Sequence, residues 1–370
     1  MLFSTLMLKK SPLMVVLLLA LASWGCGSSP NTPTASGGSP SSSGGKAAES
    51  AGSAVKLQGV GATFPEPLYK RWFNDYAKAH PHVEVNYQGK GSGAGIKDFT
   101  SKAVDFGASD AAMTDDEIAK VEDGVQLLPM TAGEIVLTYN LPKGPEELKL
   151  SREAYTKIFL NQITNWNDPI IAKANAGATL PDLPITVVTR SDSSGTTFVF
   201  TQHLSAISDE WKKGPGTSKS PPWPKSDKFI GGAKNDGVTK HIKDIEGAIG
   251  YIEYGYAQQS KLSMASLENK AGKFVKPSLE SGKATLATVK MPENLRAWIP
   301  DPEGENAYPI ITYTWLLCYK KYADKAKGDA LKDVVKFCIT EGQKMSGELG
   351  YVPLPENVVA EVTKAVDSIK

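Results

Sequence analysis

Strand-like and helix-like segments alternate along the chain from Leu57 onward, and turns containing glycine join them. The runs "KLQGVG", "VEVNYQG" and "VDFGAS" have the composition of short strands. Alternation of this kind predicts an α/β fold with a mostly parallel sheet. The predicted helix between the first two runs carries large apolar side chains on one face: Leu68, Trp72, Phe73 and Tyr76.

The alternation continues to the end of the chain. Thr114 and Glu117 have the spacing of a capping box, which predicts the start of a helix. The last part of the chain is predicted to be mainly helical, and 370 residues with 41% hydrophobic content suffice for two medium domains. Later strands are predicted for "VQLLPM", "EIVLTYN", "ITVV" and "AYPIITYTWLLCYK".

A polar turn separates a predicted strand from a predicted helix in "RSDSSGTTFVF" (190–200). The free N–H groups and the positive end of a helix dipole attract an anion at such a turn. Helix capping by Ser194 or Thr196 would explain part of the composition, but it does not explain Arg190. The turn therefore predicts a local anion site.

Three further turns have a similar character: "GATFP" (61–65), "GKGSGAG" (89–95) and "FGASD" (106–110). Their glycines allow a ligand to approach the backbone closely. Ligands of open α/β sheets lie beyond the carboxyl ends of the strands, so we expect the four turns to converge. The glycine-rich turn matches neither the phosphate-loop pattern nor the dinucleotide fingerprint, which disfavours a nucleotide site.

The first residues form a targeting segment. Two lysines precede the apolar run "LMVVLLLALA", which is short for a membrane span and typical of a secretory signal, expected over 1–25. The preceding Gly25 makes Cys26 similar to a lipoprotein cleavage position, so we expect a lipid on Cys26; cleavage by the general signal peptidase is the alternative. Ser, Gly and Pro then dominate, which predicts a flexible linker over 26–56.

Charge and cysteine content disfavour several classes of site. The 41 basic and 40 acidic residues nearly cancel, so we expect no nucleic-acid partner. Four scattered histidines and three cysteines lack metal-ligand spacing, so we expect neither a metal nor a cofactor. If Cys26 is lipidated, Cys318 and Cys338 form either a disulfide or two buried free thiols.

Six motifs together resemble one known family, and they occur in this order: "GVGATFPEPLYKRW", "VNYQGKGSGAGIKDF", "VDFGASDAAMTDDE", "RSDSSGTTFVF", "NDGVTKHI" and "GAIGYIEY". From Leu57 to Lys370 the chain resembles the periplasmic phosphate-binding protein of the bacterial phosphate-specific ABC transporter. The resemblance implies a two-lobed α/β fold, like that of periplasmic binding proteins of type II, with two crossovers at the hinge. Lobe I would comprise 57–139 plus 312–370, and lobe II 140–311.

The resemblance also implies partners, a location and a ligand set. The protein would be a monomer that binds inorganic phosphate and delivers it to the permease subunits of an ABC transporter. It would work in the periplasm or at the outer face of the cell membrane, anchored through Cys26. Asp192 would orient the side chain of Arg190. The matching phosphate-binding positions are Thr63, Phe64, Ser92, Asp110, Arg190, Ser194, Gly195 and Thr196.

Asp110 is the informative member of this set, because a buried carboxylate beside an anion is repulsive. The contact becomes favourable only when the ligand donates a proton, which hydrogen phosphate and dihydrogen phosphate do and sulfate near neutral pH does not. An unpaired buried acceptor beside an anion costs several kcal/mol, enough for roughly thousandfold discrimination. Asp110 is therefore expected to detect the proton of the ligand.

Other functions remain as alternatives. Ser194 beside Asp192 suggests a hydrolase nucleophile, but a serine needs a positioned base, and His203 would lie more than two helical turns away. The spacing is not that of a nucleophile elbow, and a phosphatase would typically show a metal cluster of His and Asp, so we do not expect an enzyme. A second alternative keeps the fold and changes the role, to a phosphate sensor, a surface protein or a receptor for arsenate, sulfate, molybdate or tungstate. Asp110 argues against oxyanions without a proton, whereas arsenate shares the protons and shape of phosphate.

Overall fold

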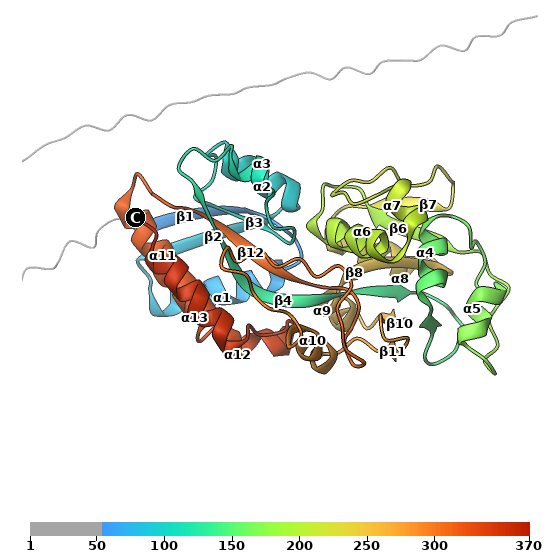
Figure 1. Cartoon of the computed structure of the whole chain (residues 1–370). Helices are drawn as coiled ribbons and strands as arrows, with labels where there is room; N and C mark the ends of the chain where they lie inside the picture. The colour runs from blue at the N-terminus through green and yellow to red at the C-terminus, as the bar shows by residue number, and fades with distance from the viewer. Residues whose placement is uncertain (1–53) are drawn as a thin grey trace, which may run out of the picture. The chain divides into compact units, whose positions relative to one another are not determined.

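One sheet of nine strands extends through the protein in the computed structural model, which describes residues 54–370. The strand order is β2-β1-β3-β12-β4-β8-β6-β7, with β9 paired to β4, and β11-β10-β5 form a separate small sheet (Figure 1). The strands are β1 (Val55–Gly61), β2 (Val83–Gly89), β3 (Phe106–Ser109), β4 (Val125–Tyr139), β5 (Lys149–Leu150), β6 (Thr186–Arg190), β7 (Phe229–Gly232), β8 (Ala248–Glu253), β9 (Ser263–Met264), β10 (Ser266–Glu268), β11 (Phe274–Val275) and β12 (Ile311–Tyr319).

The expectation of a mostly parallel sheet is wrong for the centre of the sheet. β1 is parallel to β2 and β3, and β6 is parallel to β7 and β8, as the alternation with helices predicts. In the centre, β12 is antiparallel to β3 and β4, and β4 is antiparallel to β8. β4 carries the chain out of one half of the protein and β12 carries it back, so these two neighbours run in opposite directions.

β4 is one continuous strand where the sequence suggested two successive strands. Its part up to Glu134 pairs with β12, and Ile135–Tyr139 pairs with β8. Pro129 cannot donate a ladder hydrogen bond, and the register shifts beside it: Thr314 and Trp315 of β12 face Thr131 and Pro129, so Met130 is an extra residue that forms a bulge in β4. We therefore divide the described chain into a first half (54–134 and 311–370) and a second half (135–310). This division places the first crossing within β4, and the boundary after Tyr139 that the resemblance implies lies at the end of the same strand.

The helices follow the apolar patterns of the sequence. α1 buries the predicted face of Leu68, Trp72 and Phe73, and Thr114 caps α3 by accepting from the Glu117 N–H at 3.2 Å, so both predictions are confirmed. The helices are α1 (Glu66–Ala79), α2 (Ser92–Thr100), α3 (Asp115–Ile118), α4 (Arg152–Phe159), α5 (Pro169–Ala174), α6 (Gly195–Ile207), α7 (Asp209–Lys213), α8 (Lys234–Asp244), α9 (Tyr254–Gln259), α10 (Leu279–Leu286), α11 (Lys325–Ile339), α12 (Gln343–Ser346) and α13 (Glu356–Asp367), with a 3₁₀ turn at Gly347–Leu349.

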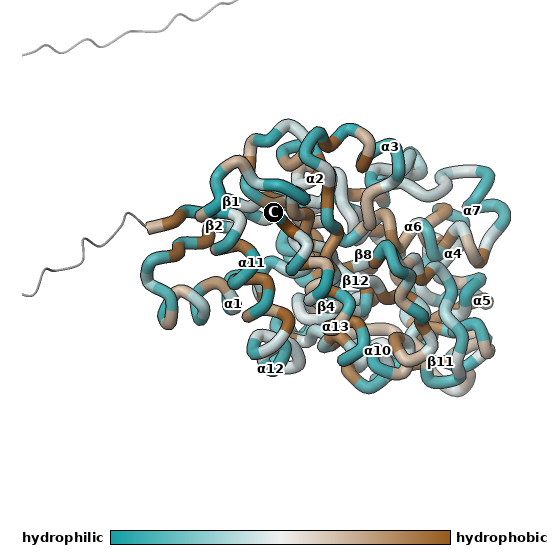
Figure 2. Tube along the Cα trace, turned by 60° about the vertical axis from the view of Figure 1, so that its left-hand side comes forward, coloured by the Kyte–Doolittle hydropathy of each residue, from teal (hydrophilic) through white to brown (hydrophobic). Residues whose placement is uncertain are grey.

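A continuous apolar core lies around the central strands. Every residue of β8 and β12 is buried, and hydrophobic segments gather around β4, β8 and β12 in the interior (Figure 2). Cys318 and Cys338 are both buried and both free, so of the two expectations for this pair the free thiols are confirmed. Burial raises the pKa of both thiols, which keeps them protonated and unreactive.

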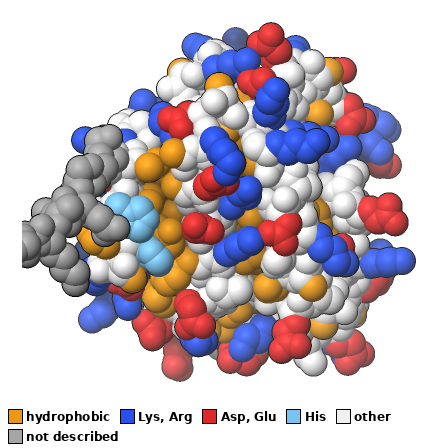
Figure 3. Space-filling model, turned by 90° about the vertical axis from the view of Figure 1, so that its left-hand side faces the viewer, with side chains coloured by type: hydrophobic (Ala, Val, Ile, Leu, Met, Phe, Trp, Pro, Cys, Tyr) orange, Lys and Arg blue, Asp and Glu red, His pale blue; other side chains and the backbone are white. Residues whose placement is uncertain are grey.

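The outer surface carries charges of both signs. On the face drawn in Figure 3, basic and acidic side chains are interspersed rather than segregated, in keeping with the balanced composition. Among the described residues, no helix is both long and apolar enough to cross a membrane. The expected leader, Cys26 and most of the expected linker lie outside the described residues. Val55 and Lys56, the end of that linker, belong to β1 instead, because they pair with Val83 and Glu84 of β2.

Candidate functional site

The four polar turns meet where the two halves of the protein face each other. Arg190, from the second half, donates through Nη2 to Thr63 Oγ1 of the first half at 3.3 Å. Thr196, also from the second half, donates to Asp110 Oδ2 of the first half at 3.3 Å. The expected positions share deep burial, with at most 5% of each residue exposed for Thr63, Phe64, Ser92, Asp110, Arg190, Ser194 and Thr196.

Arg190 ends β6 and is held by a nearby carboxylate. Its Nε and Nη2 donate to the two oxygens of Asp192 at 2.8 and 2.6 Å, a two-pronged ion pair. Asp192 also accepts from the Lys234 N–H at 2.9 Å. Burial alone would raise the pKa of Asp192, but the bonds and charge of Arg190 outweigh burial and lower it. Asp192 is therefore ionised at neutral pH and fixes the direction of the guanidinium group.

Asp110 follows β3 and is a buried carboxylate held among hydrogen-bonding partners. Thr314 of β12 donates to Oδ1 at 2.9 Å, and the Asp110 N–H donates to Ser92 Oγ at 3.1 Å. Burial raises the pKa of Asp110 to about 7, against the opposing effects of Thr314, Arg190, Thr196 and Ser92. In this closed cleft the carboxyl group thus titrates near neutral pH.

Three hydroxyl oxygens in the site accept hydrogen bonds from N–H groups. Thr63 Oγ1 accepts from Arg190, Ser92 Oγ accepts from the Asp110 N–H, and Ser194 Oγ accepts from the Thr197 N–H at 3.1 Å. A hydroxyl group has one hydrogen to give, and these contacts leave it free. The three hydroxyls can therefore act as donors to a ligand, which suits an anion.

Phe64 and Gly195 contribute backbone rather than side chain. The Phe64 side chain is fully buried in the core, so only its backbone can reach a ligand. A Cβ atom at Gly195 would lie 2.3 Å from Ser92 Oγ and 2.9 Å from the Cβ of Asp110. Any larger residue there would hold the halves apart. The N–H groups of the first turn of α6 have no partner within their own helix, and they add to the donors.

Sequence reasoning did not assign four residues that support the site. Thr314 binds Asp110, and Tyr251 binds the Arg190 N–H at 3.2 Å and the Thr197 hydroxyl at 2.7 Å. Asn235 and Tyr256 both bind Thr63. Three of the four belong to or follow the motifs "NDGVTKHI" and "GAIGYIEY", which were recognised by resemblance but given no role.

The geometry separates Ser194 from the base that a hydrolase would need. His203 is fully buried, and its two ring nitrogens bond with the Tyr155 hydroxyl at 2.8 Å and the Pro300 carbonyl at 2.7 Å. Burial lowers the pKa of His203 to about 4, so it is a neutral core residue. Within residues 54–370, no group of His, Cys, Asp or Glu is arranged to hold a metal ion.

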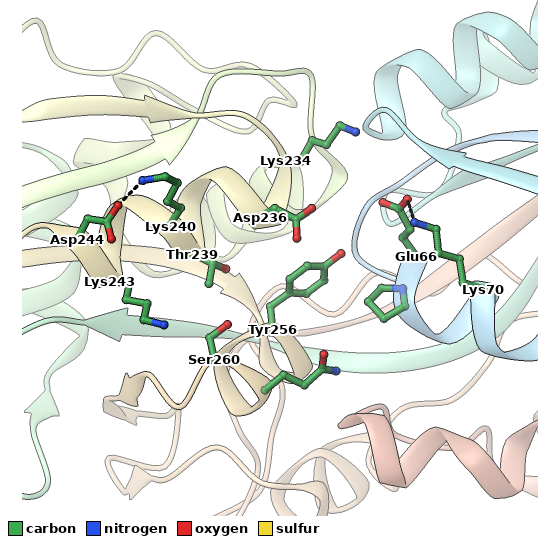
Figure 4. A pocket seen from close by; sticks show the side chains of 12 residues that line it. Glu66, Lys70, Lys234, Asp236, Thr239, Lys240, Lys243, Asp244, Tyr256 and Ser260 are labelled. Atoms are coloured by element: carbon green, nitrogen blue, oxygen red, sulfur yellow. Dashed lines mark hydrogen bonds and ion pairs between the residues drawn. The ribbon is translucent and has the colours of Figure 1, made fainter.

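A hollow of about 690 Å³ lies next to the cluster, between α1 of the first half and α8 and α9 of the second (Figure 4). Its charged lining has both signs, with Lys70 paired to Glu66 and Lys240 paired to Asp244. Tyr256 projects into it from α9. The hollow lies at the margin of the contact between the halves, and Asp110, Arg190 and Ser194 are not among the residues that line it.

Comparison with known proteins agrees with this geometry. The model of a family described as a PBP superfamily domain matches residues 45–341. The phosphate-binding protein PstS of Xylella fastidiosa is 40% identical over 311 residues, covering 83% of this chain and 84% of the relative. The chain belongs to the PstS family of the PBP superfamily. A PstS protein of Methanocaldococcus jannaschii is 39% identical over 338 residues, covering 85% of this chain and 87% of the relative.

Solved structures of phosphate-binding proteins share the fold of this PstS-family chain. A high-affinity periplasmic phosphate-binding protein (PfluDING) bound with phosphate superposes with a TM-score of 0.69 at 20% identity, covering 84% of this chain and 93% of that one. The phosphate-binding protein of Stenotrophomonas maltophilia gives a TM-score of 0.67 at 20% identity, covering 84% and 94%. The two-lobed α/β fold expected from the sequence is thus confirmed.

Proposed function

We propose that the protein binds inorganic phosphate outside the cytoplasm and delivers it to the permease of an ABC transporter. The observation that carries this proposal is the position of Asp110, a deeply buried carboxylate surrounded by hydrogen-bond donors. The membership of the PstS family supports it, because the relatives are phosphate-binding proteins.

The donor-rich site suits an anion that also carries a proton. Arg190 and the free hydroxyl hydrogens of Thr63, Ser92 and Ser194 would bind phosphate oxygens, together with the N–H groups of Phe64, Gly195 and Thr196. Asp110 would accept a hydrogen from hydrogen phosphate or dihydrogen phosphate. Because the surrounding groups are donors, this single acceptor would read the protonation state of the ligand.

The two halves would open and close around the ligand by bending at the crossings in β4 and before β12. Thr63, Phe64, Ser92 and Asp110 belong to the first half, and the residues from Arg190 to Thr196 belong to the second, so one phosphate would bond to both. Binding energy shared across the cleft favours the closed form. The permease would then recognise the closed conformation, which forms when phosphate is bound.

Titration and scattering of the protein without its leader test this function. We expect calorimetry to show one site for phosphate, comparable binding of arsenate, and roughly thousandfold weaker binding of sulfate and molybdate at neutral pH. Small-angle scattering should show a monomer whose radius of gyration falls when phosphate is added, because the halves close. A protein that binds sulfate as tightly as phosphate, or a profile that does not change, would contradict the proposal.

We further propose that a lipid on Cys26 anchors the protein at the outer face of the membrane. The apolar leader, Gly25 and the polar linker motivate this proposal. In a bacterial host, we expect mass spectrometry of the membrane fraction to find a lipid-modified peptide that begins at Cys26. Replacing Cys26 by Ala should release the protein from the membrane; an unmodified N-terminus in the unaltered protein would refute the anchor.

A further inference from the structure

Two motifs outside the expected ligand set converge on the loop that carries Thr63. The first motif, "NDGVTKHI", lies in α8 and begins with Asn235, which is fully buried. The second, "GAIGYIEY", covers β8 and the start of α9, and Tyr256 follows it. Both belong to the second half, whereas Thr63 belongs to the first. Their contacts with Thr63 therefore join the halves directly.

Asn235 binds the Thr63 side chain. Its Nδ2 donates to Thr63 Oγ1 at 3.0 Å, and its backbone N–H lies 3.4 Å from the same oxygen. The Glu253 N–H donates to Asn235 Oδ1 at 3.3 Å, which fixes the amide with its oxygen toward β8 and its nitrogen toward Thr63. Lys234, just before Asn235, has a φ of 63°, a left-handed conformation that is uncommon for a side chain of its kind.

Arg190 and Asn235 together determine what the Thr63 hydroxyl can do. A hydroxyl oxygen accepts through two lone pairs and donates one hydrogen. Arg190 at 3.3 Å and Asn235 at 3.0 Å supply two donors, so both lone pairs are occupied. The hydroxyl can no longer accept from a protonated ligand, and its hydrogen is left to be donated.

We infer that Asn235 is a positioning residue for phosphate: it holds the Thr63 hydroxyl as a donor toward the ligand and links the two halves when they close. Tyr256 supports the same loop at its backbone, since its hydroxyl donates to the Thr63 carbonyl at 2.7 Å. Its ring reaches from α9 toward α1 at the margin of the cleft (Figure 4). The inference rests on phosphate being the ligand of this site.

Substitutions at Asn235 should lower phosphate affinity itself, which a purely structural role would not do. Asn235→Ala removes one donor, and we expect phosphate affinity to fall about tenfold. Asn235→Asp keeps the size of the side chain, but its carboxylate would accept the Thr63 hydrogen and repel the bound anion. We therefore expect a fall of about a hundredfold, larger than that of the smaller alanine. If Asn235 only filled space, both substitutions would lower thermal stability and leave the phosphate affinity of the folded protein unchanged.

A double-mutant cycle with Thr63→Val tests whether Asn235 acts through the hydroxyl. In the Thr63→Val background, we expect Asn235→Ala to weaken phosphate binding by less than about twofold, because the shared contact is already gone. Asn140→Ala is the control, since the Asn140 amide donates at the same distance of 3.0 Å, but to the backbone carbonyl of Lys243 within the second half. It should leave phosphate affinity unchanged. Thermal unfolding of each variant establishes that it is folded.

The outcomes distinguish this inference from the proposed function. If the unaltered protein does not bind phosphate, the proposed function itself fails. If it binds phosphate but Asn235→Ala and Asn235→Asp bind equally well, or if the effects of Asn235→Ala and Thr63→Val simply add, the inference about Asn235 is overturned. A tenfold loss that vanishes in the Thr63→Val background supports it. Tyr256→Phe, which keeps the ring, should weaken binding severalfold if the loop contact matters.

Discussion

In the Asp110→Asn variant, we expect the preference for phosphate over sulfate to fall by roughly a thousandfold. The nitrogen of the new amide group cannot accept a hydrogen from phosphate, so phosphate binding weakens. The amide is uncharged and does not repel a fully deprotonated anion, so sulfate binding strengthens. A thousandfold change corresponds to about 4 kcal/mol. Calorimetric titration of both anions at neutral pH measures it.

The same residue gives sulfate binding a defined pH dependence. The ordinary pKa of an aspartate is 3.8, and burial in the closed cleft raises that of Asp110 to about 7. The closed form therefore binds a proton that the open form lacks between about pH 4 and 7, and closure becomes less favourable as the pH rises through this window. Since sulfate brings no proton, its affinity should rise about tenfold for each unit of pH lowered from 7 toward 4.

Two control measurements test whether these effects come from the Asp110 carboxylate. Asp116→Asn removes the same charge from an exposed position on α3 and should change neither selectivity nor its pH dependence. In Asp110→Asn, sulfate affinity should become independent of pH across the window. Unchanged selectivity in a folded Asp110→Asn protein would remove the basis for assigning phosphate to this site.

Replacement of Arg190 by Met should weaken phosphate binding by about a thousandfold or more. The guanidinium group is the positively charged donor in contact with both Thr63 and Thr196, and its side chain is only 1% exposed. Removing one member of a buried charged pair costs about 3–5 kcal/mol, part of which comes from the carboxylate that remains. Arg190→Lys keeps the charge but loses the planar fork, so we expect an intermediate loss of binding.

A second substitution separates binding from stability in this experiment. Arg190→Met leaves Asp192 without its ion-pair partner, which should lower both thermal stability and affinity. Arg190→Met combined with Asp192→Asn removes the stranded charge, so stability should recover while phosphate binding stays weak. Recovery of binding together with stability would show that Arg190 acts on the fold rather than on the ligand.

The sequence was sufficient for the local features of the fold. Helix α1, the cap at Thr114 and the strands β1 to β3 follow from periodicity and spacing, which depend on neighbouring residues. The convergence of the polar turns follows from a general property of α/β sheets. The choice of Thr63 and Asp110 as ligand positions beside Arg190 came from the resemblance to the phosphate-binding family.

Contacts between distant segments could not be predicted in the same way. Thr314 lies in an apolar strand whose composition gives no sign that one hydroxyl reaches Asp110, and the register with β4 shifts just after this residue. Asn235 and Tyr256 are far from Thr63 in the chain, and only the packing of the halves brings them to it. The antiparallel centre of the sheet was missed because alternation with helices does not reveal strands that connect two halves.

The unbroken course of β4 has a mechanical consequence. β4 is hydrogen-bonded to β12 before Glu134 and to β8 after it. A strand paired in this way resists bending more than an unpaired loop would. Glu134 itself is tied to α10 by the Ser281 hydroxyl at 2.7 Å and the Ser278 N–H at 3.0 Å, which braces the bending point. Opening and closing of the halves should then follow one direction of bending between two distinct conformations. A transporter would accordingly meet the protein in either the open or the closed conformation, with few intermediates.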